Sequence, residues 1–133
     1  MGHMSATNSI RVMLVEDHTA FREALAFLLG HDPDIEVVSQ AGSLAQAREA
    51  LLLLEGGLDA AVLDLALPDG DGSELIGELR RSNPAISIVV LSAAMGPGHI
   101  DEAVKAGAEA VLDKVESPLT IASEVRRLAA AGR

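Results

Sequence analysis

Residues 10–30 read IRVMLVEDHTAFREALAFLLG, and the spacing of the apolar side chains changes once along this stretch. The run Ile10–Val15 is rich in β-branched residues, too short for a helix and apolar enough for a buried strand. From Phe21 to Leu29 the apolar side chains recur at helical spacing, and Gly30 suits the C-cap of that helix. The stretch therefore predicts a strand followed by a helix.

The same strand–helix unit recurs along the rest of the chain. Ser43 is a candidate N-cap for the second helix, and Ser117-Pro118 opens the last helix with an N-cap followed by Pro. Further strands are expected at 35–39, 60–63, 86–91 and 110–112, and further helices at 43–54, 73–81, 100–106 and from 117 onward. Strands that alternate with helices form a parallel sheet covered by helices on both faces. Five such units predict an α/β fold of the (βα)5 kind.

Length and composition indicate one domain and exclude several classes of protein. The 133 residues suffice for a single domain, expected at 10–131, and residues 1–9 are expected to be a tag remnant and disordered N-terminus. The chain has no Cys, which excludes disulfides, thiolate nucleophiles and Cys–zinc sites. A formal charge of −10 opposes nonspecific binding to nucleic acid or anionic membranes. No apolar run reaches the ~18 residues of a membrane span, so a cytoplasmic location is expected.

Polar residues follow four of the five predicted strands. Glu16 and Asp17 come after the first, Asp64 after the third, Ser92 after the fourth and Lys114 after the fifth. In open parallel sheets, ligands bind outside the carboxyl ends of the strands. Each residue taken alone has an ordinary explanation as a cap, a turn or a solvated side chain. Their recurrence at successive strand ends predicts one shared site.

The acidic residues point to a metal ion. If the first and third strands are neighbours, Asp17 and Asp64 share a pocket with Glu16 nearby. Two like charges ~4 Å apart repel by about 4 kcal/mol at an effective dielectric near 20. Either one carboxyl takes a proton or a cation neutralises the cluster. Oxygen ligands that leave room for water suit Mg²⁺ better than Zn²⁺.

The remaining polar residues suit a phosphoryl group. Lys114 supplies a compact positive charge for phosphate oxygens, and the Ser92 hydroxyl can donate a hydrogen bond to another. Asp64 is then a candidate nucleophile, because a carboxylate can form an aspartyl phosphate. The Pro- and Gly-rich turn after Asp64 can direct the Ala66 carbonyl at the cation.

These residues lie in segments that resemble a known family. Over residues 10–130 the chain resembles the receiver domain of two-component response regulators. The matching segments are Leu14–His18 (LVEDH), Asp64–Gly72 (DLALPDGDG), Val90–Ala93 (VLSA) and Ala106–Lys114. The Glu-Asp-His opening and the Lys114 to Pro118 segment are most similar to the subfamily that carries a C-terminal helix-turn-helix output domain.

The resemblance implies a role for each acidic residue. Asp64 would be the phosphoacceptor that receives phosphate from a sensor histidine kinase. Asp17 would ligate Mg²⁺ directly, Glu16 through water, Asp64 through its carboxylate and Ala66 through its backbone carbonyl. The fold implied is flavodoxin-like, with a five-stranded sheet of order 2-1-3-4-5.

The resemblance also implies a switch. Ser92 would be the hydroxyl that moves to the phosphoryl group, and Lys114 the residue that pairs with it. The family often has an aromatic switch residue three positions before the Lys, where this chain has Val111. DNA would be contacted only through an output domain, and the Ala-rich segment 119–131 leaves a homodimer open.

Three other functions compete with this one. An aspartyl-nucleophile hydrolase of the haloacid dehalogenase type needs a second Asp where this chain has Ala66, so a turnover enzyme is not expected. A flavin-binding protein lacks support because the chain has only two aromatic residues, Phe21 and Phe27. A phosphorylation-independent interaction module of the same fold stays the alternative.

Overall fold

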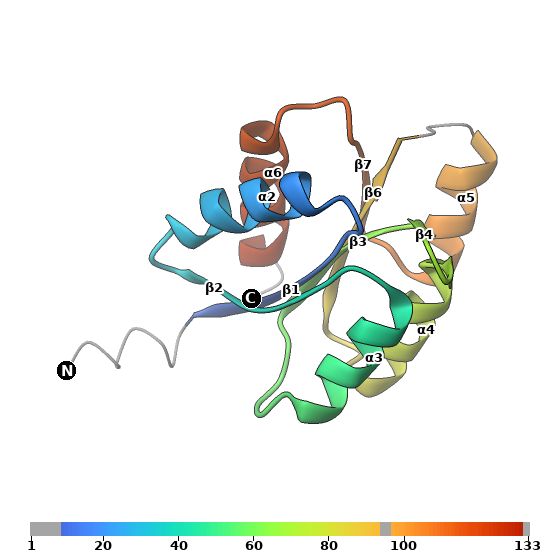
Figure 1. Ribbon diagram of the computed structural model, residues 1–133, viewed down its shortest axis with the longest axis horizontal. Coiled ribbons are helices and arrows are strands. Elements are labelled where there is room, and N and C mark those ends of the chain that lie inside the picture. The colour runs from blue at the N-terminus through green and yellow to red at the C-terminus, as the bar shows by residue number, and fades with distance from the viewer. Residues whose placement is uncertain (1–8, 94–96, 132–133) are drawn as a thin grey trace.

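The computed structural model describes residues 9–93 and 97–131. Strands and helices alternate along the chain, except that two short strands stand between the third strand and the next helix (Figure 1). In order they are β1 (Ile10–Val15), α2 (Thr19–Gly30), β2 (Ile35–Ala41), α3 (Leu44–Leu53), β3 (Ala60–Asp64), β4 (Ala66–Leu67), β5 (Gly70–Asp71), α4 (Ser73–Ser82), β6 (Ser87–Ser92), α5 (Pro97–Ala106), β7 (Ala110–Asp113) and α6 (Pro118–Ala131). Of the predicted tag remnant and disordered segment 1–9, all but Ser9 lies outside the described residues.

The main sheet has five strands in the order β2-β1-β3-β6-β7, and all its neighbouring strands are parallel. This is the predicted 2-1-3-4-5 order, so the flavodoxin-like (βα)5 fold is confirmed. β1 and β3 are direct neighbours, with Val12 opposite Ala60 and Val15 opposite Leu63. The condition on which Asp17 and Asp64 could share a pocket is therefore met.

Helices cover both faces of the sheet, with α2 and α6 on one face and α3, α4 and α5 on the other (Figure 1). Successive side chains of a strand point to opposite faces. Accordingly Val12 and Leu14 of β1 pack in the core under α2 and α6, whereas Met13 and Val15 pack in the core under the other three helices. The central strands are buried on both sides, which explains their continuous apolar runs.

Both predicted serine N-caps are present. The Ser43 hydroxyl accepts a hydrogen bond from the Gln46 N–H at 3.1 Å, and the Ser117 hydroxyl accepts one from the Thr120 N–H at 3.2 Å. The prediction of Gly30 as a C-cap is wrong. Gly30 is the last residue of α2 and its φ is not positive, and His31 is the C-cap; the His31 N–H donates to the Leu28 carbonyl and the Asp32 N–H to the Leu29 carbonyl.

Other boundaries differ by a few residues. α2 begins at Thr19, two residues before the predicted start, β2 extends to Ala41, and α5 begins at Pro97 instead of Ile100. Gly107, with φ of +118°, ends α5 in a conformation that glycine adopts without strain. These differences leave the order of elements unchanged.

The turn after β3 holds a small hairpin that the sequence did not predict. β4 and β5 pair antiparallel, with Ala66 opposite Asp71. Asp69, at the tip, accepts hydrogen bonds from the Leu44 and Ala45 N–H groups at 2.8 and 2.9 Å. The hairpin thus caps the first turn of α3 and is tied to the neighbouring helix.

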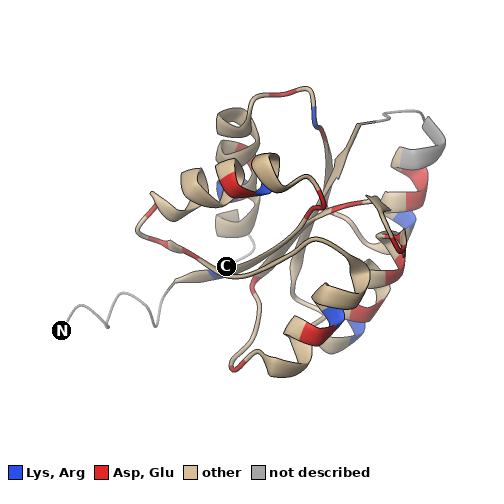
Figure 2. Ribbon diagram, in the orientation of Figure 1, with Lys and Arg blue, Asp and Glu red and all other residues tan. Residues whose placement is uncertain are grey.

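Acidic side chains lie on helices of both faces of the sheet and in the loops between them (Figure 2). The formal charge of −10 is therefore distributed over the molecule. Within residues 9–93 and 97–131, every helix is too short or too polar to span a lipid bilayer.

Candidate functional site

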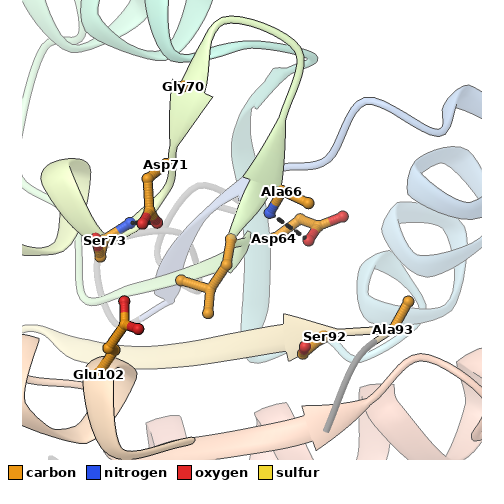
Figure 3. Close-up of a pocket in the computed structure, with 9 residues that line it drawn as sticks. Asp64, Ala66, Gly70, Asp71, Ser73, Ser92, Ala93 and Glu102 are labelled. Atoms are coloured by element: carbon orange, nitrogen blue, oxygen red, sulfur yellow. Dashed lines mark hydrogen bonds between the residues drawn. The ribbon is translucent and has the colours of Figure 1, made fainter. Parts of the chain in front are cut away.

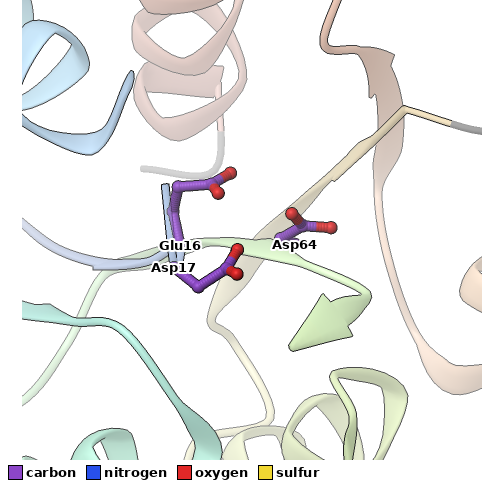
Figure 4. Close-up of side chains that lie close together, drawn as sticks. All are labelled: Glu16, Asp17 and Asp64. Carbon is purple, nitrogen blue, oxygen red and sulfur yellow. The ribbon is translucent and has the colours of Figure 1, made fainter. Parts of the chain in front are cut away.

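Three carboxylates meet at the carboxyl ends of β1 and β3. Oxygen atoms of Glu16, Asp17 and Asp64 all lie within 4.8 Å of one another (Figure 4). Glu16 and Asp64 are buried, with exposed fractions of 2% and 5%, whereas Asp17 is exposed. Because β1 and β3 are adjacent, residues 48 positions apart in the chain share one pocket at the end of the sheet.

Lys114 reaches into this cluster from the end of β7. Its Nζ atom lies 2.8 Å from Glu16 Oε1 and 3.0 Å from Asp64 Oδ2. The Lys114 N–H also donates to the Ser92 carbonyl at 3.0 Å, which ties the loop after β7 to the end of β6. The Phe21 ring, from the first turn of α2, lies 5.1 Å from the ammonium. Such a contact favours the charged form of the lysine.

Local hydrogen bonds orient the two buried carboxylates. Asp64 Oδ1 accepts from the Ala66 N–H at 3.0 Å, so the phosphoacceptor candidate is held by its own loop. Glu16 Oε2 accepts from the His18 N–H at 2.9 Å. Each of the two buried carboxylates is thus restrained by the backbone N–H two residues later in the chain.

Burial and charge set the protonation states of the cluster. Burial raises the pKa of the Glu16 carboxyl, and the neighbouring Asp64 charge adds to the rise, against the lowering effect of Lys114 and the His18 N–H. For Lys114, burial acts to lower the pKa, but the hydrogen bonds and charges of Glu16 and Asp64 together outweigh it and leave the pKa raised. The ammonium therefore stays charged at neutral pH.

The donor set fits a hard divalent cation. Three carboxylates face one ammonium, so the cluster stays negative with Lys114 in place. Glu16 Oε1 is buried and accepts no well-directed hydrogen bond from the described residues. Oxygen-only ligands with one exposed side suit Mg²⁺, which retains several waters. Glu16, Asp17 and Asp64 are the residues that would hold it.

A cavity of about 380 Å³ opens beside Asp64 (Figure 3). It lies between the β3–α4 segment, which contributes Ala66 and Asp71, the end of β6 with Ser92, and Glu102 of α5. Ser92 is buried, with an exposed fraction of 5%. A hydroxyl and a carboxylate therefore line the same hollow, which has room for a phosphoryl group.

Comparison with known proteins identifies the family. Residues 12–126 match the family model described as the response regulator receiver domain. The chain belongs to the receiver-domain family of response regulators. The sequence resemblance is thereby confirmed.

Two relatives and one solved structure illustrate the range of similar proteins. The chain is 36% identical over 124 residues to the transcriptional regulatory protein UhpA of Salmonella typhimurium, covering 92% of this chain and 60% of that protein. It is 35% identical over 121 residues to the DNA-binding transcriptional activator DevR/DosR of Mycobacterium tuberculosis, covering 91% and 55%. The signal receiver domain of NarL from Mycobacterium tuberculosis superposes with a TM-score of 0.80 at 27% identity, covering 95% of this chain and 99% of that one. This receiver domain thus spans little more than half the length of the curated relatives it matches.

All the side chains predicted for the site of this receiver domain lie at one edge of the sheet. Asp17, Asp64 and Glu16 form the acidic cluster, Lys114 bridges two of them, and Ser92 lines the adjoining cavity. Ala66 contacts Asp64 through its N–H. The ligand role of the Ala66 carbonyl stays a prediction, as do the individual roles of the others.

Two nearby residues of this receiver domain were not predicted to belong to the site. Phe21 was predicted only as the start of the helical stretch to Leu29, and it is half-buried against Lys114. Glu102 lines the cavity from α5, a helix whose sequence carries no motif. The sequence held a signal for Phe21, which lies one turn after the Glu16-Asp17 pair, and none for Glu102.

Proposed function

We propose that this chain is the phosphoacceptor domain of a two-component phosphorelay, in which a sensor histidine kinase phosphorylates Asp64 in the presence of Mg²⁺. The observation that carries the proposal is the buried Asp64 carboxylate, which lies in one cluster with Glu16 and Asp17 and 3.0 Å from the Lys114 ammonium. No ordinary packing role requires three carboxylates and a lysine at three strand ends. Their arrangement suits transfer of a phosphoryl group to a carboxylate.

The residues have distinct tasks in this transfer. An Asp64 oxygen attacks phosphorus, so that an O–P bond forms while the bond from phosphorus to the donor histidine nitrogen breaks and its electron pair leaves with the imidazole. Mg²⁺, when bound, screens the approach of one anion to another and stabilises the charge on the transferring group. Lys114 neutralises phosphoryl oxygens from the side of Asp64 Oδ2. The Ala66 N–H keeps Asp64 Oδ1 oriented throughout.

Phosphorylation would then alter the surface beside the site. The phosphoryl group adds roughly −1.5 to −2 charges at Asp64. Ser92 can donate its hydroxyl to the new anion, and Lys114 can turn from Glu16 toward it. Ser92 ends β6, the strand that precedes α5, and Lys114 follows β7, so the output surface is proposed to be α5 with β7. Val111 is half-buried in β7 and packs against the core, so the shift is proposed to proceed without an aromatic side chain.

DNA is a partner only of a longer protein in this proposal. UhpA and DevR/DosR are named as transcriptional or DNA-binding regulators, and this chain spans 60% and 55% of their length. The charge of −10 opposes attraction to a phosphate backbone. DNA contact is therefore assigned to a segment outside this domain.

Intact-mass measurement tests the assignment of Asp64. Incubation with MgCl₂ and a small phosphodonor such as phosphoramidate is expected to add one phosphoryl group, mapped to Asp64 after digestion. The adduct should disappear with EDTA and in Asp64→Asn, whereas Asp101→Asn, an exposed site on α5, should label like the wild type. Labelling that persists in Asp64→Asn contradicts the phosphoacceptor role. A wild-type chain that neither labels nor binds Mg²⁺ favours the phosphorylation-independent module.

A further inference from the structure

The first turn of α2 sends a side chain back to the loop that carries the acidic pair. Arg22 forms the ordinary first helical hydrogen bond, from its N–H to the His18 carbonyl at 2.9 Å. Its guanidinium, however, donates from Nη1 to the backbone carbonyl of Glu16 at 2.6 Å. A helix residue thus contacts the main chain of the acidic loop directly.

The Glu16 backbone is held from both sides as a result. Its N–H donates to the Ala41 carbonyl of β2 at 2.9 Å, and its carbonyl accepts from Arg22. The peptide bond between Glu16 and Asp17 is planar. A hydrogen bond that fixes the Glu16 carbonyl therefore also fixes the plane of this peptide, which contains the Asp17 Cα. Asp17 is exposed and is not fixed by burial. The direction of its carboxylate therefore depends on this plane.

The surroundings of Arg22 indicate that the contact is built into the fold. A Cβ atom at Gly42 would lie 3.2 Å from Arg22 Nη1, 3.3 Å from Gln46 Oε1 and 3.9 Å from the Asp17 Cα. The Arg22 Nε atom is buried and has no hydrogen-bond partner among the described residues. Burial of a donor without a partner is unfavourable. The guanidinium keeps this position at a cost that its bond to Glu16 helps to offset.

We propose, on the basis of the function proposed above, that Arg22 is a positioning residue that orients Asp17 for the divalent cation by holding the Glu16 carbonyl. Outer partners that orient metal ligands commonly contribute 10- to 100-fold to metal affinity. A purely electrostatic role predicts the opposite sign, because a guanidinium near the acidic cluster repels the cation. Removal of the side chain therefore distinguishes positioning from charge.

Calorimetric titration of the full chain with MgCl₂ tests this role. Arg22→Met is expected to weaken Mg²⁺ binding by about 10-fold or more, and Arg22→Lys, which keeps one donor, should recover part of the loss. Arg126→Met, which removes the same charge from an exposed position of α6, should bind like the wild type. At saturating MgCl₂ the maximal labelling rate of Arg22→Met should return to that of the wild type. A merely structural defect would lower the maximal labelling rate at saturating MgCl₂ as well as the Mg²⁺ affinity.

A second variant keeps the Arg22 charge and disturbs the position of the guanidinium. Gly42→Ala crowds Arg22 Nη1 and is also expected to weaken Mg²⁺ binding, which matters if Arg22→Met folds poorly. Mg²⁺ affinity that is unchanged or higher in Arg22→Met, or unchanged in a folded Gly42→Ala, overturns the positioning role. A wild-type chain that neither takes up a phosphoryl group nor binds Mg²⁺ overturns the proposed function itself, which separates the two failures.

Discussion

Gly72 lies where the turn after β5 passes against the backbone of Asp64. Its N–H donates to the Leu65 carbonyl at 2.8 Å, and its φ of −59° is open to any residue. Space is the constraint, because a Cβ at this position would overlap the Asp64 carbonyl oxygen and approach the Leu65 Cα to 3.1 Å. The glycine thus allows two segments of main chain to meet directly under the phosphoacceptor candidate.

Gly72→Ala is expected to destabilise the domain by about 1–3 kcal/mol, the usual cost of overpacking a site whose neighbours are backbone. Chemical denaturation followed by circular dichroism measures this, since the chain has no Trp. Gly77→Ala is the matched control within α4, where the new Cβ meets only the Arg81 side chain at 3.4 Å. The free energy of unfolding of that variant should rise by up to about 1 kcal/mol, because Ala has a higher helix propensity than Gly. Equal stability of Gly72→Ala and wild type would contradict the close approach.

Residue type and position were enough to predict the members of the site that stand directly after strands. Asp64 and Lys114 belong there because the carboxyl ends of parallel strands lie at the same edge of the sheet, which brings a carboxylate and an ammonium at these positions together. The contributions of Phe21 and Arg22 could not be predicted in this way. Their side chains lie on a helix, and where a helical side chain ends depends on how α2 packs against the ends of β1 and β7.

At the scale of elements, the hairpin of β4 and β5 links the site to α3. Two-residue strands leave no periodic pattern in the sequence, so the segment reads as an irregular turn. By residue type and position, Asp69 and Asp71 are candidates to cap the turn and the following helix, which holds for Asp71, whose carboxylate accepts from the Ser73 N–H at 2.9 Å. Asp69 instead caps the first turn of α3, where the Leu44 and Ala45 N–H groups that it accepts from lie 25 and 24 positions earlier in the chain. Tertiary packing, which brings the hairpin beside α3, decided this partner.

Asp69 should make the stability of the domain depend on acid pH. The hydrogen bonds from the Ala45 and Leu44 N–H groups lower the pKa of the Asp69 carboxyl below its ordinary value. The stabilisation is therefore present above the ordinary pKa of an unfolded Asp, about 3.9, and is lost as the pH falls through the lowered value. Asp69→Ala is expected to reduce Tm at pH 7, and the difference from wild type should shrink below about pH 4.

Thermal unfolding between pH 3 and pH 7 measures this effect. Glu49→Ala is the matched control, because it removes the same charge from an exposed position of α3. A Tm difference between Asp69→Ala and the wild type that stays constant across this range would show that the carboxylate form of Asp69 contributes nothing to the stability of the domain.

For the whole molecule, periodicity alone predicted the layers, because five buried strands alternating with helices leave few ways to cover a sheet. The strand order followed from the family resemblance and not from the pattern of any one strand. Boundaries were less predictable. Gly30 suited a C-cap, yet α2 includes Gly30 as its last residue and the C-cap is His31. Local signals mark where a helix can end, and packing determines where it does.

The metal site joins segments that only the complete fold brings together, so Mg²⁺ should stabilise the domain as a unit. At a Mg²⁺ concentration of 100 times Kd, the free energy of unfolding should increase by about 2.7 kcal/mol. For a domain of this size, this corresponds to a rise in Tm of roughly 10 °C. Asp17→Asn should lose most of this rise, since Asp17 is a member of the acidic cluster.

Screening must be separated from binding in this experiment. A charge of −10 makes the folded chain repel itself, so any salt raises Tm to some extent. NaCl at matched ionic strength measures that background, and the specific rise is what MgCl₂ adds beyond it. If NaCl reproduces the full rise, or Asp17→Asn retains it, Mg²⁺ acts on this chain only as a screening salt and the three carboxylates do not form its site.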